Sequence, residues 1–120
     1  MKQSEGWPSK EVLIVIGSDP RISARPAEAV RVADGLSQSE ELRISLLISG
    51  AAAEAFGAPD HEWIEGPLLL KHLMALKQRQ VRLYLQGRGT PALIEHLPLE
   101  SIDGQAASAL RAGAPLVIDF

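Results

Sequence analysis

The sequence contains no cysteine among its 120 residues. Thiolate catalysis and disulfide formation both need a cysteine sulfur, so this chain can carry out neither. Aromatic residues are also scarce, at 4% of the chain, although 46% of the residues are hydrophobic. The core must therefore be built mainly from Leu, Ile, Val and Ala, a composition that suits helices packed on a buried sheet.

Long apolar runs and basic runs are missing as well. The longest uninterrupted apolar stretch, residues 12–16, is far shorter than the roughly 20 residues of a membrane helix. The 12 basic and 15 acidic residues are interspersed, which argues against a phosphate-binding patch for nucleic acid. The first ten residues lack the apolar segment of a signal peptide. We therefore expect a cytoplasmic protein without a membrane span or a nucleic-acid partner.

The length is that of one domain. Gly6 and Pro8 flank Trp7 in a polar opening segment, so residues 1–10 are expected to form a flexible N-terminal tail. Residues 11–120 are expected to form a single α/β domain. Nothing in the sequence repeats or is of low complexity.

Strand and helix signals alternate through this domain. Apolar, β-branched segments predict strands at residues 12–16, 42–48, 81–85, 99–102 and 115–120. Amphipathic spacing, with Pro or Asp at several starts, predicts helices at residues 26–39, 51–56, 67–79, 90–97 and 103–113. This order predicts a three-layer α/β fold, in which helices cover both faces of a mostly parallel sheet of about five strands.

Several of these stretches resemble the DsrE/DsrF-like family of sulfur-relay proteins, which includes the Tus subunits of tRNA thiolation. The resemblance rests on the first strand with its Gly-Ser-Asp-Pro loop, the helix that follows, the Leu-Leu-Ile-Ser-Gly end of the second strand, the helix at 66–79, and the strands at 81–85 and 114–120. It implies a DsrE-like fold and a tendency to form homo-oligomers or hetero-oligomers with related subunits.

One position departs from the resemblance. Catalytic members of the family carry a persulfide-accepting cysteine just after the third strand, where this chain has Gln86. Persulfide relay needs a thiolate that attacks a sulfane sulfur, and a carboxamide cannot do so. We therefore expect a non-catalytic subunit or interaction protein, linked to sulfur metabolism but without persulfide chemistry of its own.

A second hypothesis is a small-molecule protein that binds an anion or a nucleotide. In parallel sheets, ligands bind beyond the carboxyl ends of the strands, where helix N-termini present free N–H groups. The loops there supply the candidate ligand-binding residues Ser18, Asp19, Arg25, Ser49, Gln86 and Arg88. Ordinary turns between strands and helices would contain the same residue types.

Catalytic and metal sites find less support. No serine lies in a nucleophile-elbow pattern, so no catalytic residue is assigned, and an enzyme using His61 or His72 with a carboxylate is a third hypothesis. The spacing of the histidines and acidic residues at 60–72 fits no known metal site, and no cofactor is expected. Trp63 is either an exposed anchor for a partner or a part of the core.

Overall fold

The computed structural model of the chain describes residues 10–56, 60–87 and 99–120. Its sheet has five strands in the order β4-β3-β2-β1-β5, and every neighbouring pair is parallel. The strands are β1 Lys10–Ile16, β2 Leu42–Ile48, β3 Arg82–Gln86, β4 Leu99–Ile102 and β5 Leu116–Asp119. The sheet expected from the sequence is confirmed, with β5 placed next to β1 at the edge.

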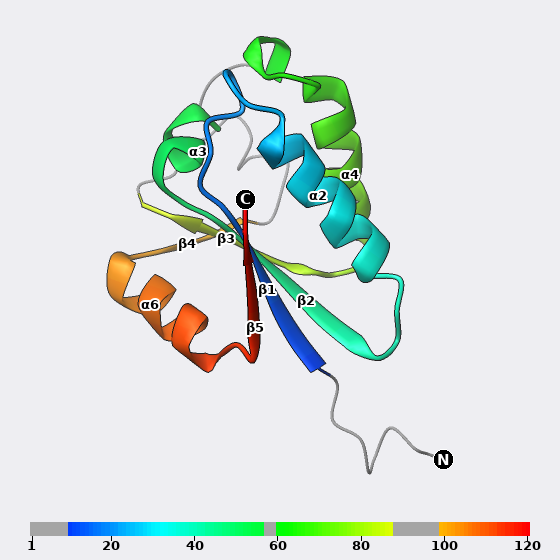
Figure 1. Cartoon of the computed structure of the whole chain (residues 1–120), viewed down its shortest axis with the longest axis vertical. Helices are drawn as coiled ribbons and strands as arrows, with labels where there is room; N and C mark the ends of the chain where they lie inside the picture. Colours follow the sequence, from blue (N-terminus) through cyan, green and yellow to red (C-terminus); the bar gives the residue numbers. More distant parts are fainter. Residues whose placement is uncertain (1–9, 57–59, 88–98) are drawn as a thin grey trace.

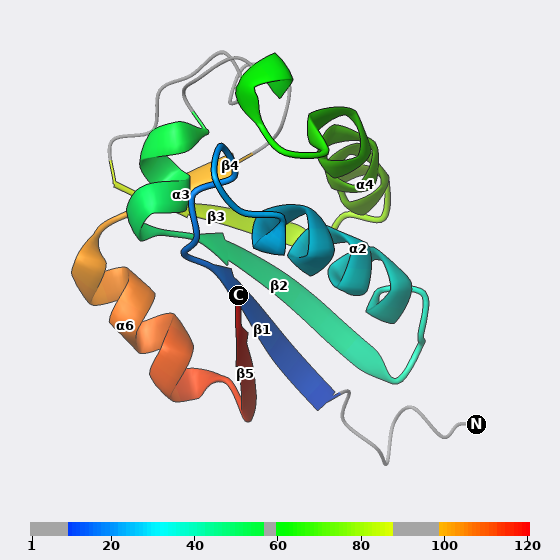
Figure 2. The ribbon, with the colours of Figure 1, turned by 45° about the horizontal axis from the view of Figure 1, so that its top comes forward.

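Four helices and one short turn of 3₁₀-helix connect the described strands. They are α2 Arg25–Leu36, α3 Gly50–Ala55, η1 Asp60–Glu62, α4 Gly66–Gln78 and α6 Gly104–Gly113. Helices α2, α3 and α4 lie on one face of the sheet and α6 lies on the other (Figures 1 and 2). The chain is thus a three-layer α/β fold. The helix expected at residues 90–97 lies outside the described residues.

The core lies mainly between the sheet and the face that carries α2 and α4. In β1, Ile14 and Ile16 are fully buried against these helices, while Leu13 and Val15 are buried on the side of α6. Successive side chains of a strand point to opposite faces, so an unbroken apolar run requires cover on both sides. The apolar stripe of α4, which includes Leu69, Leu73 and Leu76, is also fully buried.

Local signals explain where the helices begin and end. Pro26 occupies the first turn of α2, and α2 ends at Leu36, earlier than its apolar spacing suggested. The hydroxyl of Ser37 donates to the Asp34 carbonyl at 2.7 Å there, a local bond that competes with further helix. Asp103 caps α6 as expected, because its Oδ1 accepts a hydrogen bond from the Ala106 N–H at 2.8 Å.

Trp63 belongs to the core. Its side chain is 4% exposed and stacks on Phe56, with the ring centroids 4.9 Å apart. The indole N–H donates to the Ala55 carbonyl at 3.1 Å, which satisfies its polar atom inside the protein. Of the two alternatives left open by the sequence, the structure selects the buried one.

Candidate functional site

A cleft of about 450 Å³ lies at the carboxyl end of β3, between α3 and the start of α6. It is lined by Gly50, Ala53, Glu54, Leu85, Gln86, Gly87, Asp103 and Gly104. Three of these residues are glycines, so the backbone itself forms much of the wall. Since ligands of parallel sheets bind at this end of the strands, the cleft is the best candidate site in the described part of the chain.

The backbone next to Gln86 adopts a conformation that favours glycine. Gly87 has φ of 115°, a conformation that residues with a side chain rarely adopt, and its N–H donates to the Ile102 carbonyl at 3.0 Å. This bond ties the end of β3 to the end of β4. A Cβ added at Gly104 would lie 3.6 Å from the Gln86 Nε2 atom, so the Gln86 amide faces the first turn of α6.

The charges of the cleft follow from its lining. The ionisable side chains among its described lining residues are Glu54 and Asp103, and both are acidic. Asp103 already accepts the hydrogen bond that caps α6. Gln86 adds an amide that can donate and accept hydrogen bonds. It cannot act as a nucleophile, or as a general acid or base near neutral pH. The cleft can therefore bind a polar group.

Two of the six candidate residues contact the last strand instead of lining this cleft. The Ser18 hydroxyl donates to the Phe120 carbonyl at 3.0 Å. The Arg25 guanidinium donates to the Asp119 carbonyl at 3.2 Å and lies over the Phe120 ring, 5.8 Å from its centroid. Both side chains hold the loop after β1 against the end of β5.

Asp19 forms a local pair in the same loop. Its carboxylate accepts from the Arg21 backbone N–H at 2.9 Å and from the Arg21 Nη2 at 2.8 Å. These hydrogen bonds from Arg21 lower the pKa of the Asp19 carboxyl and raise the pKa of Arg21. The pair is exposed, so it orders the loop without forming a buried site.

Ser49 and Gln86 are the two candidates that the structure brings to the cleft side. Ser49 precedes α3, and its backbone N–H donates to the Ile16 carbonyl at 2.9 Å. It is followed by Gly50, which lines the cleft next to the residues of β3. Arg88 lies outside the described residues. The assignment of the six residues to one ligand remains a prediction.

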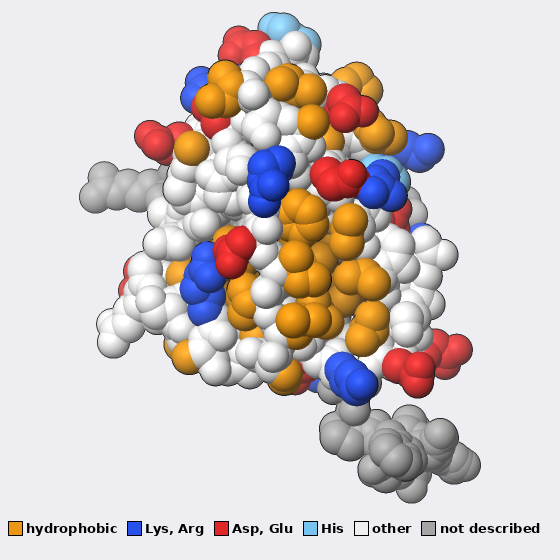
Figure 3. Space-filling view, viewed as in Figure 1, with side chains coloured by type: hydrophobic (Ala, Val, Ile, Leu, Met, Phe, Trp, Pro, Cys, Tyr) orange, Lys and Arg blue, Asp and Glu red, His pale blue; other side chains and the backbone are white. Residues whose placement is uncertain are grey.

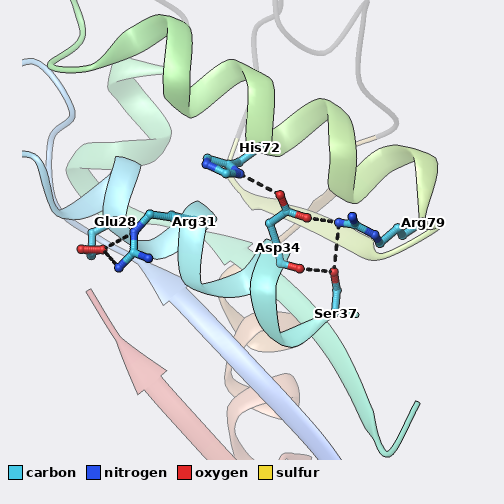
Figure 4. Close-up of polar contacts among 6 residues, drawn as sticks. All are labelled: Glu28, Arg31, Asp34, Ser37, His72 and Arg79. Carbon is cyan, nitrogen blue, oxygen red and sulfur yellow. Dashed lines mark hydrogen bonds and ion pairs between the residues drawn. The ribbon is translucent and has the colours of Figure 1, made fainter. Parts of the chain in front are cut away.

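Sequence reasoning missed a polar network between α2 and α4 (Figure 4). The Asp34 carboxylate binds His72 Nδ1 at 2.7 Å and also pairs with Arg79. The His72 side chain is 17% exposed, so the network is partly buried. His72 and Arg79 are seven residues apart and so share a helix face, which was a usable signal; their partner on α2 was not predictable from spacing.

Within residues 10–56, 60–87 and 99–120, no three His, Asp or Glu side chains gather closely enough to hold a metal ion. Over the same ranges, each helix is too short or too polar to cross a bilayer.

Comparison with known proteins gives a likeness of fold. Neither the models of known protein families nor the curated proteins give a match to this chain. The crystal structure of the YchN protein from E. coli superposes with a TM-score of 0.71 at 23% sequence identity. The match covers 92% of this chain and 99% of YchN. This chain therefore has the fold of YchN over almost its whole length.

Proposed function

We propose that this chain is a non-catalytic DsrE-like subunit that acts through its surfaces in an oligomer. YchN has a fold of the DsrE-like, sulfur-relay type, and the likeness spans nearly both chains. That likeness supports the resemblance read from the sequence motifs, which extend from the first strand to the last. The expected setting is cytoplasmic sulfur metabolism, with copies of this chain or related subunits as partners.

The observation that carries the proposal is the residue at the carboxyl end of β3. The resemblance places the family's persulfide-accepting cysteine there, and this chain has Gln86, which ends the strand and lines the cleft. A cysteine at this place would lie near the positive end of the α6 dipole, which favours a thiolate, while the carboxylates of Glu54 and Asp103 oppose it. The chain thus keeps the expected architecture around the site and lacks the sulfur atom that the chemistry needs.

Restoring the sulfur tests this interpretation directly. The Gln86→Cys variant would carry the sole thiol of the chain, and it should accept a sulfane sulfur from a low-molecular-weight persulfide. In that step the thiolate attacks the outer sulfur of the donor, and the donor leaves as its own thiolate. Mass spectrometry would show a gain of one sulfur atom.

The control for this test is Leu68→Cys, because Leu68 is 37% exposed on α4, away from the cleft. We expect Gln86→Cys to react at least about tenfold faster than the control at neutral pH, as a lowered thiol pKa predicts. Equal rates would show that Gln86 does not occupy a site adapted to sulfur chemistry, and the proposal would lose its main support.

The cleft supports a second candidate function, the binding of a small polar molecule. Its volume falls within the range of small-molecule sites. The acidic side chains Glu54 and Asp103 favour a neutral or cationic group near Gln86 over a phosphate. A thermal-shift screen that includes polyamines, nucleosides and nucleotides would test it. If no compound raises the melting temperature, the cleft is not a ligand site.

A further inference from the structure

Exposed apolar side chains gather at the carboxyl end of the sheet. Ile22 lies in the loop between β1 and α2, Ile64 lies between η1 and α4, and Leu68 lies in the first turn of α4. Their side chains are 79%, 38% and 37% exposed, and we call these three residues the Ile22 surface. In the space-filling view, hydrophobic and acidic side chains lie together at the top of the molecule, the end that carries η1 (Figure 3). Neighbouring exposed apolar side chains rimmed by charge are typical of an interaction surface.

The loop that carries Ile22 is ordered by hydrogen bonds. The Arg21 side chain and backbone N–H both donate to the Asp19 carboxylate, and the Ile22 N–H donates to the Asp19 carbonyl at 3.2 Å. The Ile64 N–H donates to the Pro20 carbonyl at 2.7 Å, which ties this loop to the segment before α4. A loop that is already ordered loses little conformational freedom when a partner covers it. Ile22 is therefore suited to anchor a partner.

Carboxylates surround the one guanidinium next to Ile22. The hydrogen bonds to the Asp19 side chain raise the pKa of Arg21, and the charges of Asp19, Glu62 and Glu54 raise it further. A single cation thus faces three carboxylates. Glu65, directly before α4, adds an exposed fourth. Within the part of the chain that the structure describes, Glu54, Glu62 and Glu65 form no ion pair.

The other basic residues at this end do not balance the acidic ones. Arg25 lies over the Phe120 ring at the end of β5, and Lys71 lies on α4. Two ion pairs, Glu28–Arg31 and Arg111–Asp119, cancel internally. The remaining described Lys, Arg, Asp and Glu side chains at the carboxyl end are three basic ones, Arg21, Arg25 and Lys71, and five acidic ones, Asp19, Glu54, Glu62, Glu65 and Asp103. Five against three leaves two negative charges around the Ile22 surface and the cleft.

This charge decides between the occupants of the surface. Two copies of the chain that met through it would place the same carboxylates against one another, and nucleic acid or an anionic membrane would be repelled for the same reason. A protein segment with Lys or Arg around an apolar side chain would match both the charge and the exposed Ile22. We infer that the Ile22 surface binds a basic segment of a different protein, whose apolar side chain packs on Ile22.

The inference rests on the proposed function, because it names the kind of partner that a subunit acting through its surfaces would bind. The cations of the segment would face Glu54, Glu62 and Glu65. Glu54 also lines the cleft, so the bound segment would lie beside the cleft that contains Gln86. The partner is thus a different protein, held at the carboxyl end of the sheet.

The first test measures the binding of three labelled peptides to the full chain by fluorescence anisotropy. One peptide has leucines at helical spacing with lysines between them, the second has glutamate in place of lysine, and the third has serine in place of leucine. We expect the first to bind at least about tenfold tighter than either of the others, and its affinity to fall as salt is added. No binding of the first peptide, or equal binding of the lysine and glutamate peptides, overturns the inference.

Two triple variants locate the site of binding. Changing Glu54, Glu62 and Glu65 together to glutamine should weaken binding of the first peptide at least about tenfold. The matched control changes three exposed carboxylates at the opposite end of the sheet to glutamine and should alter binding less than about twofold. These control residues are Glu11, Glu40 and Glu41. Equal losses in the two triple variants would show an attraction without a site and would overturn the inference.

The apolar part of the surface is tested by Ile22→Ser. The Ile22 side chain is 79% exposed, so the substitution should leave the fold intact, and circular dichroism would establish this for every variant. We expect the first peptide to bind Ile22→Ser at least about fivefold more weakly than wild type, because the peptide leucines lose their apolar contact. Unchanged affinity would mean that Ile22 is not the anchor.

Cross-linking identifies the natural partner. Because the chain has no cysteine, Ile22→Cys and Glu40→Cys each carry a single thiol that benzophenone maleimide can label. Illumination in an extract of the native host should join position 22 to a segment of another protein, and mass spectrometry should show that this segment is rich in Lys and Arg. Position 40 should not capture the same segment. No cross-link at position 22, or one to an acidic segment or a second copy of this chain, overturns the inference.

The outcomes separate this inference from the proposed function. A wild-type oligomer that binds no basic segment through Ile22 overturns the inference and leaves the oligomeric subunit standing. A monomer that binds a basic segment through Ile22 supports the inference and contradicts the oligomer. A monomer that binds no such segment overturns both.

Discussion

Strands β1 and β5 lie side by side and have similar apolar sequences, yet their surroundings differ. Residues 12–16 of β1 are all buried, because β1 has a strand on each side and helices over both faces. In β5, Leu116 and Asp119 are exposed and the two residues between them are half-buried. Apolar sequence makes both segments strands, but the neighbours decide how much of each is buried. The excess apolar surface of β5 is what points to a partner.

The largest predicted effect comes from the pair Ile14 and Ile118, which are direct neighbours in the sheet. Ile14→Ala should lower the free energy of unfolding by about 2–5 kcal/mol, because it leaves a cavity in a closed core. Ile118→Ala should cost the isolated chain about 1 kcal/mol or less, since its side chain already contacts water. Urea denaturation at low protein concentration measures both. Equal losses would mean that β5 is as well covered as β1.

Asp34 is expected to stabilise the packing of α4 on α2, the two helices that cover β1. Asp34→Ala removes the acceptor of both His72 and Arg79 between α2 and α4, and should cost about 1–2 kcal/mol in this partly buried setting. Glu28→Ala is the matched control, since its pair with Arg31 is exposed and lies within one helix. It should cost about 0.5 kcal/mol or less. If both variants lose the same stability, the network does not fix α4 on α2.

Asp103 is expected to stabilise α6, the helix on the opposite face of the sheet. Asp103→Ala removes the side-chain acceptor of the Ala106 N–H and should cost about 1 kcal/mol. Asp103→Ser keeps a capping oxygen and should restore most of the loss. Hydrogen exchange should show faster exchange in α6 and β5 than in β1 for Asp103→Ala. An equal increase in β1 would show that the two sides of the sheet do not open separately.

The smallest effect concerns Asp19 and pH. Its pKa is lowered by the hydrogen bonds from Arg21, so the carboxylate is favoured in the folded state. The ionised Asp19 stabilises the folded state at pH values above 3.8, the ordinary pKa of the carboxyl. This stabilisation is lost as the pH falls through the lowered pKa of the folded state. Asp19→Asn should therefore slightly lower stability at neutral pH, where this contribution is present, and match wild type in strong acid, which flattens the acid side of the stability curve. An acid limb identical to wild type would contradict the pKa direction.

Sequence patterns were sufficient for the described strands, their parallel arrangement and the helices α2, α3, α4 and α6. They succeeded there because periodicity, Pro26 and the Asp103 cap are local signals. Sequence patterns predicted the burial of individual side chains less well. They did not decide whether Trp63 lies in the core or on the surface, and they did not distinguish the exposed Leu116 from the buried Val12. Both depend on what packs against the residue and not on its neighbours in the chain.

The candidate site was predicted less completely than the fold. The position of Gln86 at the carboxyl end of β3 followed from the strand pattern. The contacts of Ser18 and Arg25 with Phe120 and Asp119 did not, because they join residues about one hundred positions apart. Glu54 and Gly104 were also missed as lining residues of the cleft, since no local motif marks them.

The most direct test of the central claim is native mass spectrometry of the full chain purified gently from its own host. The account predicts a defined oligomer, either of this chain alone or with a related subunit that carries the missing cysteine. A monomer with neither a partner nor a second copy, at every concentration at which the chain stays in solution, would contradict it.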